Sequence, residues 1–273
     1  MGERENREAV VEFDRVALRF EEHVVLREVS FRLERGETKV LLGVAGTGKS
    51  VLLKMTMGLL QPDSGRIFVL GEEITNRSEP ELFQIRRQIG MVFQEGALFD
   101  SLTVGENVGY VFQRLPEVSP EEADRRVREA LCFVEMEHTL DLFPSQLSGG
   151  MRRRVAIARA IVGQPEIMLY DSPTAGLDPI TALRIMTLVL KQRDVSEISS
   201  LLVTHRMRDA FRMAHFYYDH QQERVLPAGG NGADRDTHTR FLVLRDGDVI
   251  FHGRLQELGP KRDPYLHKFL PHL

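Results

Sequence analysis

The sequence predicts an α/β fold with a mainly parallel sheet. Two short apolar runs, VLL at 40–42 and IMLY at 167–170, have the composition of strands that are buried on both faces. The first run leads into a glycine-rich loop, and a helical apolar pattern follows over 51–59. Strand-like and helical segments alternate again after a central helical region, an order that is typical of parallel sheets with crossover helices.

Length and composition limit the classes of protein that fit. The chain has 273 residues, enough for one large domain or two small ones, and 42% hydrophobic with 28% charged residues is typical of a globular protein. The formal net charge of -4 does not favour a nucleic-acid partner. No apolar stretch approaches the ~20 residues that span a bilayer, and the charged N-terminus lacks the apolar core of a secretion signal. We therefore expect a cytosolic chain, which another chain would have to hold if it works at a membrane.

A phosphate-binding loop is the strongest motif. Residues 43–50 read GVAGTGKS and match the P-loop pattern between a strand and a helix. The glycines allow a tight turn whose N–H groups face inward, and the helix N-terminus that follows favours anions. Lys49 can reach the β- and γ-phosphates of a nucleotide, and the Ser50 hydroxyl can ligate Mg²⁺. The predicted nucleotide site comprises Gly43, Val44, Ala45, Gly46, Thr47, Gly48, Lys49, Ser50 and Val51.

Two further motifs lie downstream of this loop. Asp171 ends the run IMLYD, so its carboxylate would emerge at the carboxyl end of a buried strand, where it can hold Mg²⁺ directly or through water. The segment SQLSGGMRRR at 145–154 precedes an apolar helical pattern, and its two glycines leave the first N–H groups of that helix uncovered. The basic run 152–154 is expected on a solvated helix face. The turn predicts a second anion site at Ser148, Gly149 and Gly150.

The order of the motifs resembles the nucleotide-binding subunit of an ATP-binding cassette (ABC) transporter. The series is the P-loop, Gln94 in MVFQ, LSGGM, YDSPTAGLD and His205 in LLVTH, and the resemblance extends from about residue 11 to about residue 253. It implies a P-loop RecA-like core with a mainly parallel sheet, an N-terminal antiparallel β subdomain and a helical subdomain. It also implies ATP and Mg²⁺ as cofactors, and two copies of the chain that meet head to tail with ATP between them.

The resemblance assigns roles within one chain. Gln94 would sense Mg²⁺ and the attacking water, and His205 would hydrogen-bond the γ-phosphate. Ser50, Gln94 and Asp171 would hold Mg²⁺. Phe20 in VALRFEEH aligns best with an aromatic residue that stacks on adenine, and a place in the core is the equal alternative.

Other residues would act across the dimer. Ser148, Gly149 and Gly150 would cap the γ-phosphate of the ATP bound to the second copy. Asp178, in the turn AGLD, would reach across the interface.

A serine stands where this family usually has a glutamate. Ser172 follows Asp171 directly, and its hydroxyl can orient a water but cannot accept the proton at neutral pH. General-base catalysis is typically worth about 10²–10⁴ in rate, whereas phosphoryl transfer depends mostly on positioning and electrostatics. We therefore expect intact ATP binding and slow hydrolysis, with Ser172, His205 and Gln94 around the water. The alternatives are an ATP-gated dimer clamp with little turnover, an engineered serine that traps the ATP state, and a soluble ABC protein outside transport.

A narrower resemblance concerns residues 93–110. This segment, FQEGALFDSLTVGENVGY, is similar to the ATPases of lipid transporters of the Mla and mammalian-cell-entry (Mce) type, and SGGM and LDPIT agree with it. The similarity implies phospholipid or other hydrophobic cargo, an integral membrane permease contacted through about 93–110, and a lipid-binding MCE-type protein in the same complex. It implies a position at the cytoplasmic face of the inner membrane, and leaves open whether a small regulatory subunit binds the helical arm.

The chain divides into one large domain and two additions. The ABC ATPase domain is expected over 8–253, with the helical subdomain at about 97–160. Residues 219–239 are polar and glycine-rich, which predicts a flexible insertion or, as the sharper alternative, a docking element for a partner. The tail over 254–273 carries apolar side chains that we expect to pack on the second copy, namely Tyr265, Leu266, Phe269 and Leu270.

Overall fold

The centre of the fold is a six-stranded sheet. The computed structural model describes residues 8–230, 233–258 and 263–267. Within these ranges the sheet has the order β14-β13-β3-β8-β7-β6, in which β14 is antiparallel to β13 and the other neighbours are parallel. Val40 and Leu42 belong to the core on one face and Leu41 to the core on the other, so the sheet is covered on both faces. The strands are β3 (Thr38–Leu42), β6 (Ile89–Val92), β7 (Ile167–Asp171), β8 (Ser199–Val203), β13 (Thr239–Arg245) and β14 (Asp248–Gly253).

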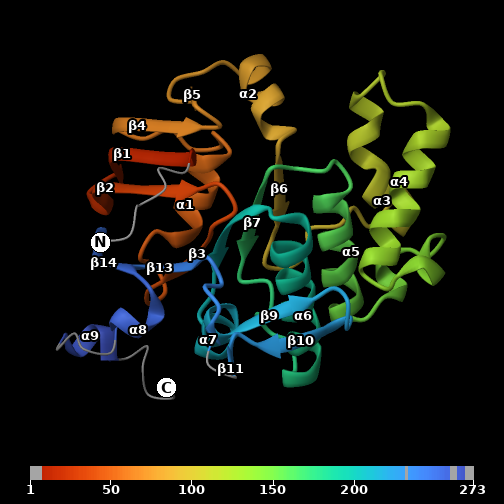
Figure 1. Cartoon of the computed structure of the whole chain (residues 1–273). Coiled ribbons are helices and arrows are strands. Elements are labelled where there is room, and N and C mark those ends of the chain that lie inside the picture. Colours follow the sequence, from red (N-terminus) through yellow and green to blue (C-terminus); the bar gives the residue numbers. More distant parts are fainter. Residues whose placement is uncertain (1–7, 231–232, 259–262, 268–273) are drawn as a thin grey trace.

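A second, antiparallel sheet forms one side of the molecule (Figure 1). Its order is β2-β1-β4-β5, and it joins β1 (Ala9–Phe20), β2 (His23–Glu34), β4 (Ser64–Val69) and β5 (Glu72–Glu73). In β2 the buried Val29, Phe31 and Leu33 alternate with exposed residues, which is the pattern of a strand with one face on a core. Phe31 stacks on Phe13 of β1 with ring centroids 4.7 Å apart.

The helices complete the architecture. α3 and α4 lie at the side of the molecule opposite the antiparallel sheet, with α5 next to them (Figure 1). The fold class expected from the sequence, with a P-loop core, an antiparallel β subdomain and a helical region, is therefore confirmed. The helices are α1 (Lys49–Thr56), α2 (Glu79–Arg86), α3 (Val104–Gly109), α4 (Pro120–Phe133), α5 (Gly149–Ile161), α6 (Pro179–Ser196) and α7 (Met207–His215), with short 3₁₀ turns at Tyr110–Arg114, Glu137–Thr139 and Pro144–Gln146.

Residues 219–239 do not form the irregular loop that their composition predicted. β9 (Phe216–Asp219) pairs antiparallel with β10 (Arg224–Pro227), and β11 (Gly229–Gly230) pairs with β12 (Ala233–Asp234). The segment is thus largely two short hairpins, and β9 packs on α6. Glycine and polar residues were misleading here because a partly exposed hairpin needs few apolar side chains of its own.

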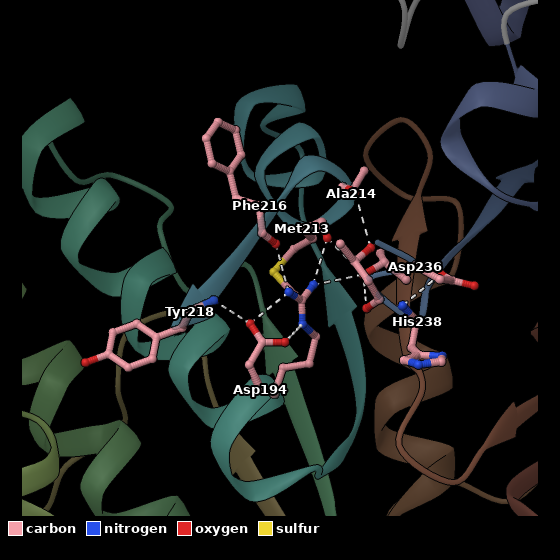
Figure 2. A network of polar contacts seen from close by, with 10 residues as sticks. Asp194, Met213, Ala214, Phe216, Tyr218, Asp236 and His238 are labelled. Carbon is pink, nitrogen blue, oxygen red and sulfur yellow. Dashed lines mark hydrogen bonds and ion pairs between the residues drawn. The ribbon is translucent and has the colours of Figure 1, made fainter. Parts of the chain in front are cut away.

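A buried ion pair anchors the β9–β10 hairpin to the core (Figure 2). Arg193 of α6 is 5% exposed, and its Nε lies 2.7 Å from Oδ1 of Asp194. The same guanidinium donates to the carbonyls of Met213 and Phe216, each at 2.8 Å. The Asp194 carboxylate in turn accepts the N–H of Tyr218 at 2.7 Å. The ends of α6 and α7 and the strand β9 are therefore joined through one charged pair.

The tail also differs from expectation. After α8 (Leu255–Leu258), α9 (Pro264–His267) lies against the same chain. Leu266 is 1% exposed and belongs to its own core, and the hydroxyl of Tyr265 bonds to backbone groups of the same chain. These two residues are therefore not left exposed for a second copy. Phe269 and Leu270 lie outside the described residues.

In the parts of the chain that the structure describes, no helix combines the length and the apolar character needed to cross a bilayer.

Replacing Arg193 by leucine should destabilise the protein strongly. The variant strips the buried Asp194 carboxylate of its counter-charge and leaves the carbonyls of Met213 and Phe216 without this donor. Because removing one partner of a buried pair leaves an uncompensated charge, we expect the free energy of unfolding to fall by about 3–5 kcal/mol. Guanidinium-induced unfolding measures it.

The matched control is Arg125→Leu on α4. Arg125 also bonds carboxylates, those of Glu122 and Glu129, but its side chain is 55% exposed. Exposed pairs contribute little, so this variant should unfold almost like the native chain. Similar losses in the two variants would contradict the anchoring role of Arg193.

Candidate functional site

Four parallel strands bring the sequence motifs to one edge of the central sheet. β3, β8, β7 and β6 are consecutive neighbours. Their registers align Leu41 with Val203, Val203 with Asp171, and Tyr170 with Val92. The residues that follow these positions therefore emerge side by side at the carboxyl edge, where ligands bind in open α/β sheets. They are the P-loop after β3, His205 after β8, Asp171 at the end of β7, and Gln94 after β6.

The P-loop is held around the ammonium group of Lys49. This side chain is 4% exposed, and its Nζ donates to the carbonyls of Gly43 and Val44 at 2.9 and 2.7 Å and to the Thr47 hydroxyl at 3.1 Å. Gly43 has to be glycine here, because its φ is +154° and a Cβ would lie 2.7 Å from the carbonyl oxygen of Leu244. The loop then leads into α1, whose first N–H groups are open to phosphate.

Charged groups from three strands influence one another at this edge. Burial lowers the pKa of Lys49 to about 8, and the Asp171 carboxylate acts in the opposite direction. Burial, followed by the nearby Lys49 charge, lowers the pKa of His205, whereas Asp171 and a hydrogen bond with the Gly43 backbone raise it. The strand registers and these electrostatic influences agree in placing Lys49, Asp171 and His205 near one another. The roles of these residues in binding and catalysis remain predictions.

Ser172 is turned inward behind Asp171. It is 4% exposed, its N–H donates to the Val203 carbonyl at 2.9 Å, and its Oγ lies 3.4 Å from Oδ1 of Asp171. Its φ of +48° is uncommon for a residue with a side chain. The residue that follows β7 therefore has a hydroxyl side chain and not a carboxylate.

A buried carboxylate lies deeper behind this turn. Asp209 of α7 is 4% exposed and hydrogen-bonds the hydroxyls of Thr174 and Thr204, the latter at 3.1 Å. Burial raises the pKa of Asp209, and the two hydroxyls oppose that shift. Glu166 precedes β7, at the end of the strand opposite Asp171, and pairs with Arg35 at 2.7 Å.

The glycine turn before α5 is exposed, as a second anion site requires. Ser148 and Gly149 are exposed, and the Ser148 hydroxyl accepts the N–H of Met151 at 3.3 Å as the helix cap. Gly150 packs so closely on α6 that a Cβ would lie 2.4 Å from the Thr181 methyl group. Asp178 caps α6, because its Oδ1 accepts hydrogen bonds from the N–H groups of residues 180 and 181, each at 3.0 Å. One of its carboxylate oxygens is therefore already hydrogen-bonded within this chain.

Two arginines for which the sequence indicated no such role bind the turn between β7 and α6. Arg153 is 8% exposed and donates to the carbonyls of Phe93 and Ala175, at 3.1 and 3.2 Å. Arg206 donates to the Thr174 carbonyl at 3.0 Å. The basic run was expected to be solvated, and for Arg153 that was wrong. Its spacing of three and four residues from the buried positions 156 and 157 is the signal that puts it on the inner face of α5.

Gln94 and Phe20 occupy exposed positions. Gln94 directly follows Phe93, whose carbonyl Arg153 holds. Beside it a cleft of about 480 Å³ lies between the segment 95–100, the start of α5 and the turn 175–177. Phe20 is 49% exposed at the tip of the β1–β2 hairpin, and further along β2 Leu26 contacts Gly48 of the P-loop. An exposed ring is not part of the core, and adenine stacking stays the prediction for Phe20.

The donor set fits Mg²⁺. Ser50, Gln94 and Asp171 offer hydroxyl, amide and carboxylate oxygens, and Mg²⁺ is usually bound by one or two protein oxygens together with nucleotide phosphates. Among the described residues there is no cluster of three or more His, Cys, Asp or Glu that could hold a metal ion without such a ligand.

The fold and this edge define a P-loop nucleotide-binding protein. The chain belongs to the ABC transporter family, whose family model matches residues 26–175. It is similar to the protein TRIGALACTOSYLDIACYLGLYCEROL 3 of Arabidopsis thaliana, with 34% identity over 92% of this chain and 70% of that protein. It is also similar to the methionine import ATP-binding protein MetN of Bifidobacterium longum, with 39% identity over 74% of this chain and 50% of that one.

Solved structures agree with this membership. The dimeric ATP-binding cassette MJ0796 bound to ADP and Pi has a TM-score of 0.73 and 30% identity, and the match covers 90% of this chain and 98% of that one.

A further relative in sequence is the Fe(3+) ions import ATP-binding protein FbpC of Escherichia coli (strain K12), which is 34% identical over 88% of this chain and 67% of its own length. The chain spans between half and about 70% of the length of the curated relatives it matches. The broad family resemblance is thus confirmed, and the narrower one to lipid transporters remains a prediction.

ATP affinity should fall as the pH rises through about 8. The pKa of Lys49 is lowered to about 8 without nucleotide, and bound phosphates would raise it. Because the pKa is higher in the complex, binding is strongest where Lys49 already carries its proton, below pH 8, and requires proton uptake above it. We expect the dissociation constant of MgATP to rise by up to about tenfold per pH unit above 8.

Calorimetric titrations at pH 7, 8 and 9 measure this dependence. The control is Lys49→Arg, whose guanidinium does not titrate in this range, so the slope above pH 8 should vanish in it. An equally steep slope in that variant would exclude Lys49 as the cause.

Proposed function

We propose that this chain is the ATP-binding and ATP-hydrolysing subunit of a membrane ABC transporter. One observation carries the proposal, namely that the registers of β3, β8 and β7 bring the P-loop with Lys49, His205 and Asp171 to one carboxyl edge of the sheet. The membership in the ABC transporter family supports it. Several relatives are named as import ATP-binding proteins, which supports a role in transport.

The roles within one chain follow from these positions. Residues 43–51 would hold the phosphates through backbone N–H groups and Lys49. Ser50, Gln94 and Asp171 would hold Mg²⁺, which supplies charge neutralisation at the β- and γ-phosphates when bound. His205 would donate to the γ-phosphate, and Phe20 would stack on adenine.

A second copy would complete the site. The exposed turn at residues 148–150 offers helix N–H groups that are not occupied by the nucleotide of its own P-loop, and Asp178 lies at the start of α6 nearby. The dimeric state of MJ0796 supports such an arrangement. In it, the turn of one copy would cap the γ-phosphate bound by the other.

The serine sets the expected rate. Because Ser172 cannot take a proton from water and its hydroxyl is directed to Asp171, the chain would hydrolyse ATP through positioning and charge stabilisation. Gln94 and His205 would orient the water. The alternative is an ATP-gated dimer clamp that hydrolyses very little ATP. It differs from the proposed ATPase only in the rate of ATP hydrolysis.

Hydrophobic cargo is the finer part of the proposal. The segment 93–110 carries the similarity to Mla/Mce-type lipid transporters, and the name of the relative from Arabidopsis thaliana contains that of a glycolipid. Other relatives are named for methionine, iron and sulfate, so the names do not agree on one cargo. In this proposal an integral membrane permease holds the chain at the cytoplasmic face of the inner membrane through about 93–110. An MCE-type lipid-binding protein belongs to the same complex, and no nucleic acid takes part.

The cleft beside residues 95–100 supports this permease contact. It has about 480 Å³ and is lined by the acidic Glu95 and Asp100 and by the basic Arg152. Phe99 next to it is 44% exposed. A groove with both charges and an exposed aromatic ring is suited to a short segment of another protein.

Turnover of ATP by the chain with its permease tests the proposal. We expect the native complex to exceed a Lys49→Ala background, and Ser172→Glu to turn over about 10²-fold faster or more, because it restores a proton acceptor beside the water. Phosphate release from complexes purified out of detergent-solubilised membranes measures both.

Three outcomes would change the account. Native turnover at background with an active Ser172→Glu variant would favour the clamp. Equal rates for the native chain and Ser172→Glu would mean that no base is needed at this position. Purification without any integral membrane partner would favour an ABC protein outside transport.

A further inference from the structure

The C-terminal tail contacts the first turn of the P-loop. The hydroxyl of Tyr265, on α9, accepts the N–H of Val44 at 3.1 Å and donates to the carbonyl of Leu244 at 2.9 Å. Its single proton and one of its lone pairs are thus both used. Leu244 lies on β13, the neighbour of the P-loop strand β3, so this one hydroxyl joins the tail, the sheet and the loop.

The tyrosine is held in place from several sides. The Asp263 carboxylate accepts the N–H of Tyr265 at 2.8 Å and pairs with Arg245 at 3.0 Å. The guanidinium of Arg245 lies over the tyrosine ring, 5.5 Å from its centroid. The next residue, Leu266, is buried in the core. A side chain restrained in this way presents its hydroxyl at a defined position.

The contact fixes the orientation of one peptide group. A trans peptide is planar, so the carbonyl of Gly43 and the N–H of Val44 point in opposite directions. Tyr265 binds the N–H at one edge of this peptide group. At the opposite edge the Gly43 carbonyl accepts a hydrogen bond from the Lys49 ammonium at 2.9 Å. Because Gly43 has no Cβ, the rotation about its ψ angle, which sets this plane, is only weakly restrained by the residue itself.

We propose that Tyr265 is a positioning residue for nucleotide binding, which orients the Gly43–Val44 peptide so that Lys49 faces the phosphate site. The inference rests on the proposed ATP site and extends it by a residue from the far end of the chain. The tail is then part of the site's support, and a change in the tail alters the affinity for nucleotide.

The substitution Tyr265→Phe tests this role in the full chain. Phenylalanine keeps the ring beside Arg245 and removes only the hydroxyl. Because a hydrogen bond that orients the loop is lost, we expect MgATP to bind about three- to tenfold more weakly. Equilibrium calorimetry measures the dissociation constant without depending on turnover. In turnover assays the KM should rise while kcat stays close to native.

Tyr217→Phe is the matched control. Tyr217 is a half-buried tyrosine on β9, whose ring lies under Arg235 with the guanidinium 4.1 Å from the centroid. Its loss of a hydroxyl should leave ATP affinity unchanged. Thermal melts establish that both variants are folded at the temperature of the titration. If Tyr265→Phe does not fold, Asp263→Asn takes its place, because it loosens the tail but keeps the hydroxyl, and it should weaken binding by a smaller factor.

The outcomes separate this inference from the proposed function. Native affinity in Tyr265→Phe, with no binding in Lys49→Ala, overturns the positioning role and leaves the ATP site intact. Equal weakening in Tyr265→Phe and Tyr217→Phe also overturns it, because the effect is then not specific to the P-loop contact. No binding of MgATP by the native chain overturns the proposed function itself.

Discussion

The parallel register of β3, β8, β7 and β6 is the constraint on which the rest of this structure depends. Parallel strands bring their carboxyl ends to one edge, so loops that are far apart in the sequence meet there without further connections. The P-loop adds a helix N-terminus at that edge. This arrangement buries the ammonium group of Lys49, which is unfavourable without polar partners. The carbonyls of Gly43 and Val44 and the Thr47 hydroxyl supply these partners. The fold alone thus brings together the groups that are proposed to bind phosphate.

The position after Asp171 carries a hydroxyl. Ser172 is buried and its Oγ lies 3.4 Å from the Asp171 carboxylate, so the side chain at this position would not act as a general base in the proposed site. The rate of hydrolysis in the proposed site would then depend on how firmly the turn after Asp171 is positioned. Arg153 and Arg206 bind the carbonyls of that turn from α5 and from the segment after β8. Because α5 begins at the glycine turn and carries Arg153, this helix links the glycine turn to the turn after Asp171.

Local patterns in the sequence were sufficient to predict the motifs at the carboxyl edge of the sheet. They did not predict the hairpin and the tail that pack around the core. The P-loop and Asp171 could be predicted because each couples a strand, a turn and a ligand type within a few residues. The hairpin at residues 216–227 could not, because it depends on Arg193 and Asp194, which precede it by more than twenty residues and look like ordinary surface charges. The tail was misjudged for a similar reason. The apolar side chain of Leu266 suggested a second copy, whereas it packs in its own core, and Arg245 holds Asp263 beside it.

In the proposed function, one chain carries half of an ATP site and a second copy supplies the rest. Sedimentation of the purified chain with MgATP, with MgADP and without nucleotide tests it most directly, because the exposed turn at residues 148–150 has a ligand to cap only when a γ-phosphate is bound. The account predicts a dimer in MgATP and monomers in the other two conditions. Slow hydrolysis would prolong the dimer. A chain that binds MgATP and remains monomeric at concentrations well above its dissociation constant would contradict the account.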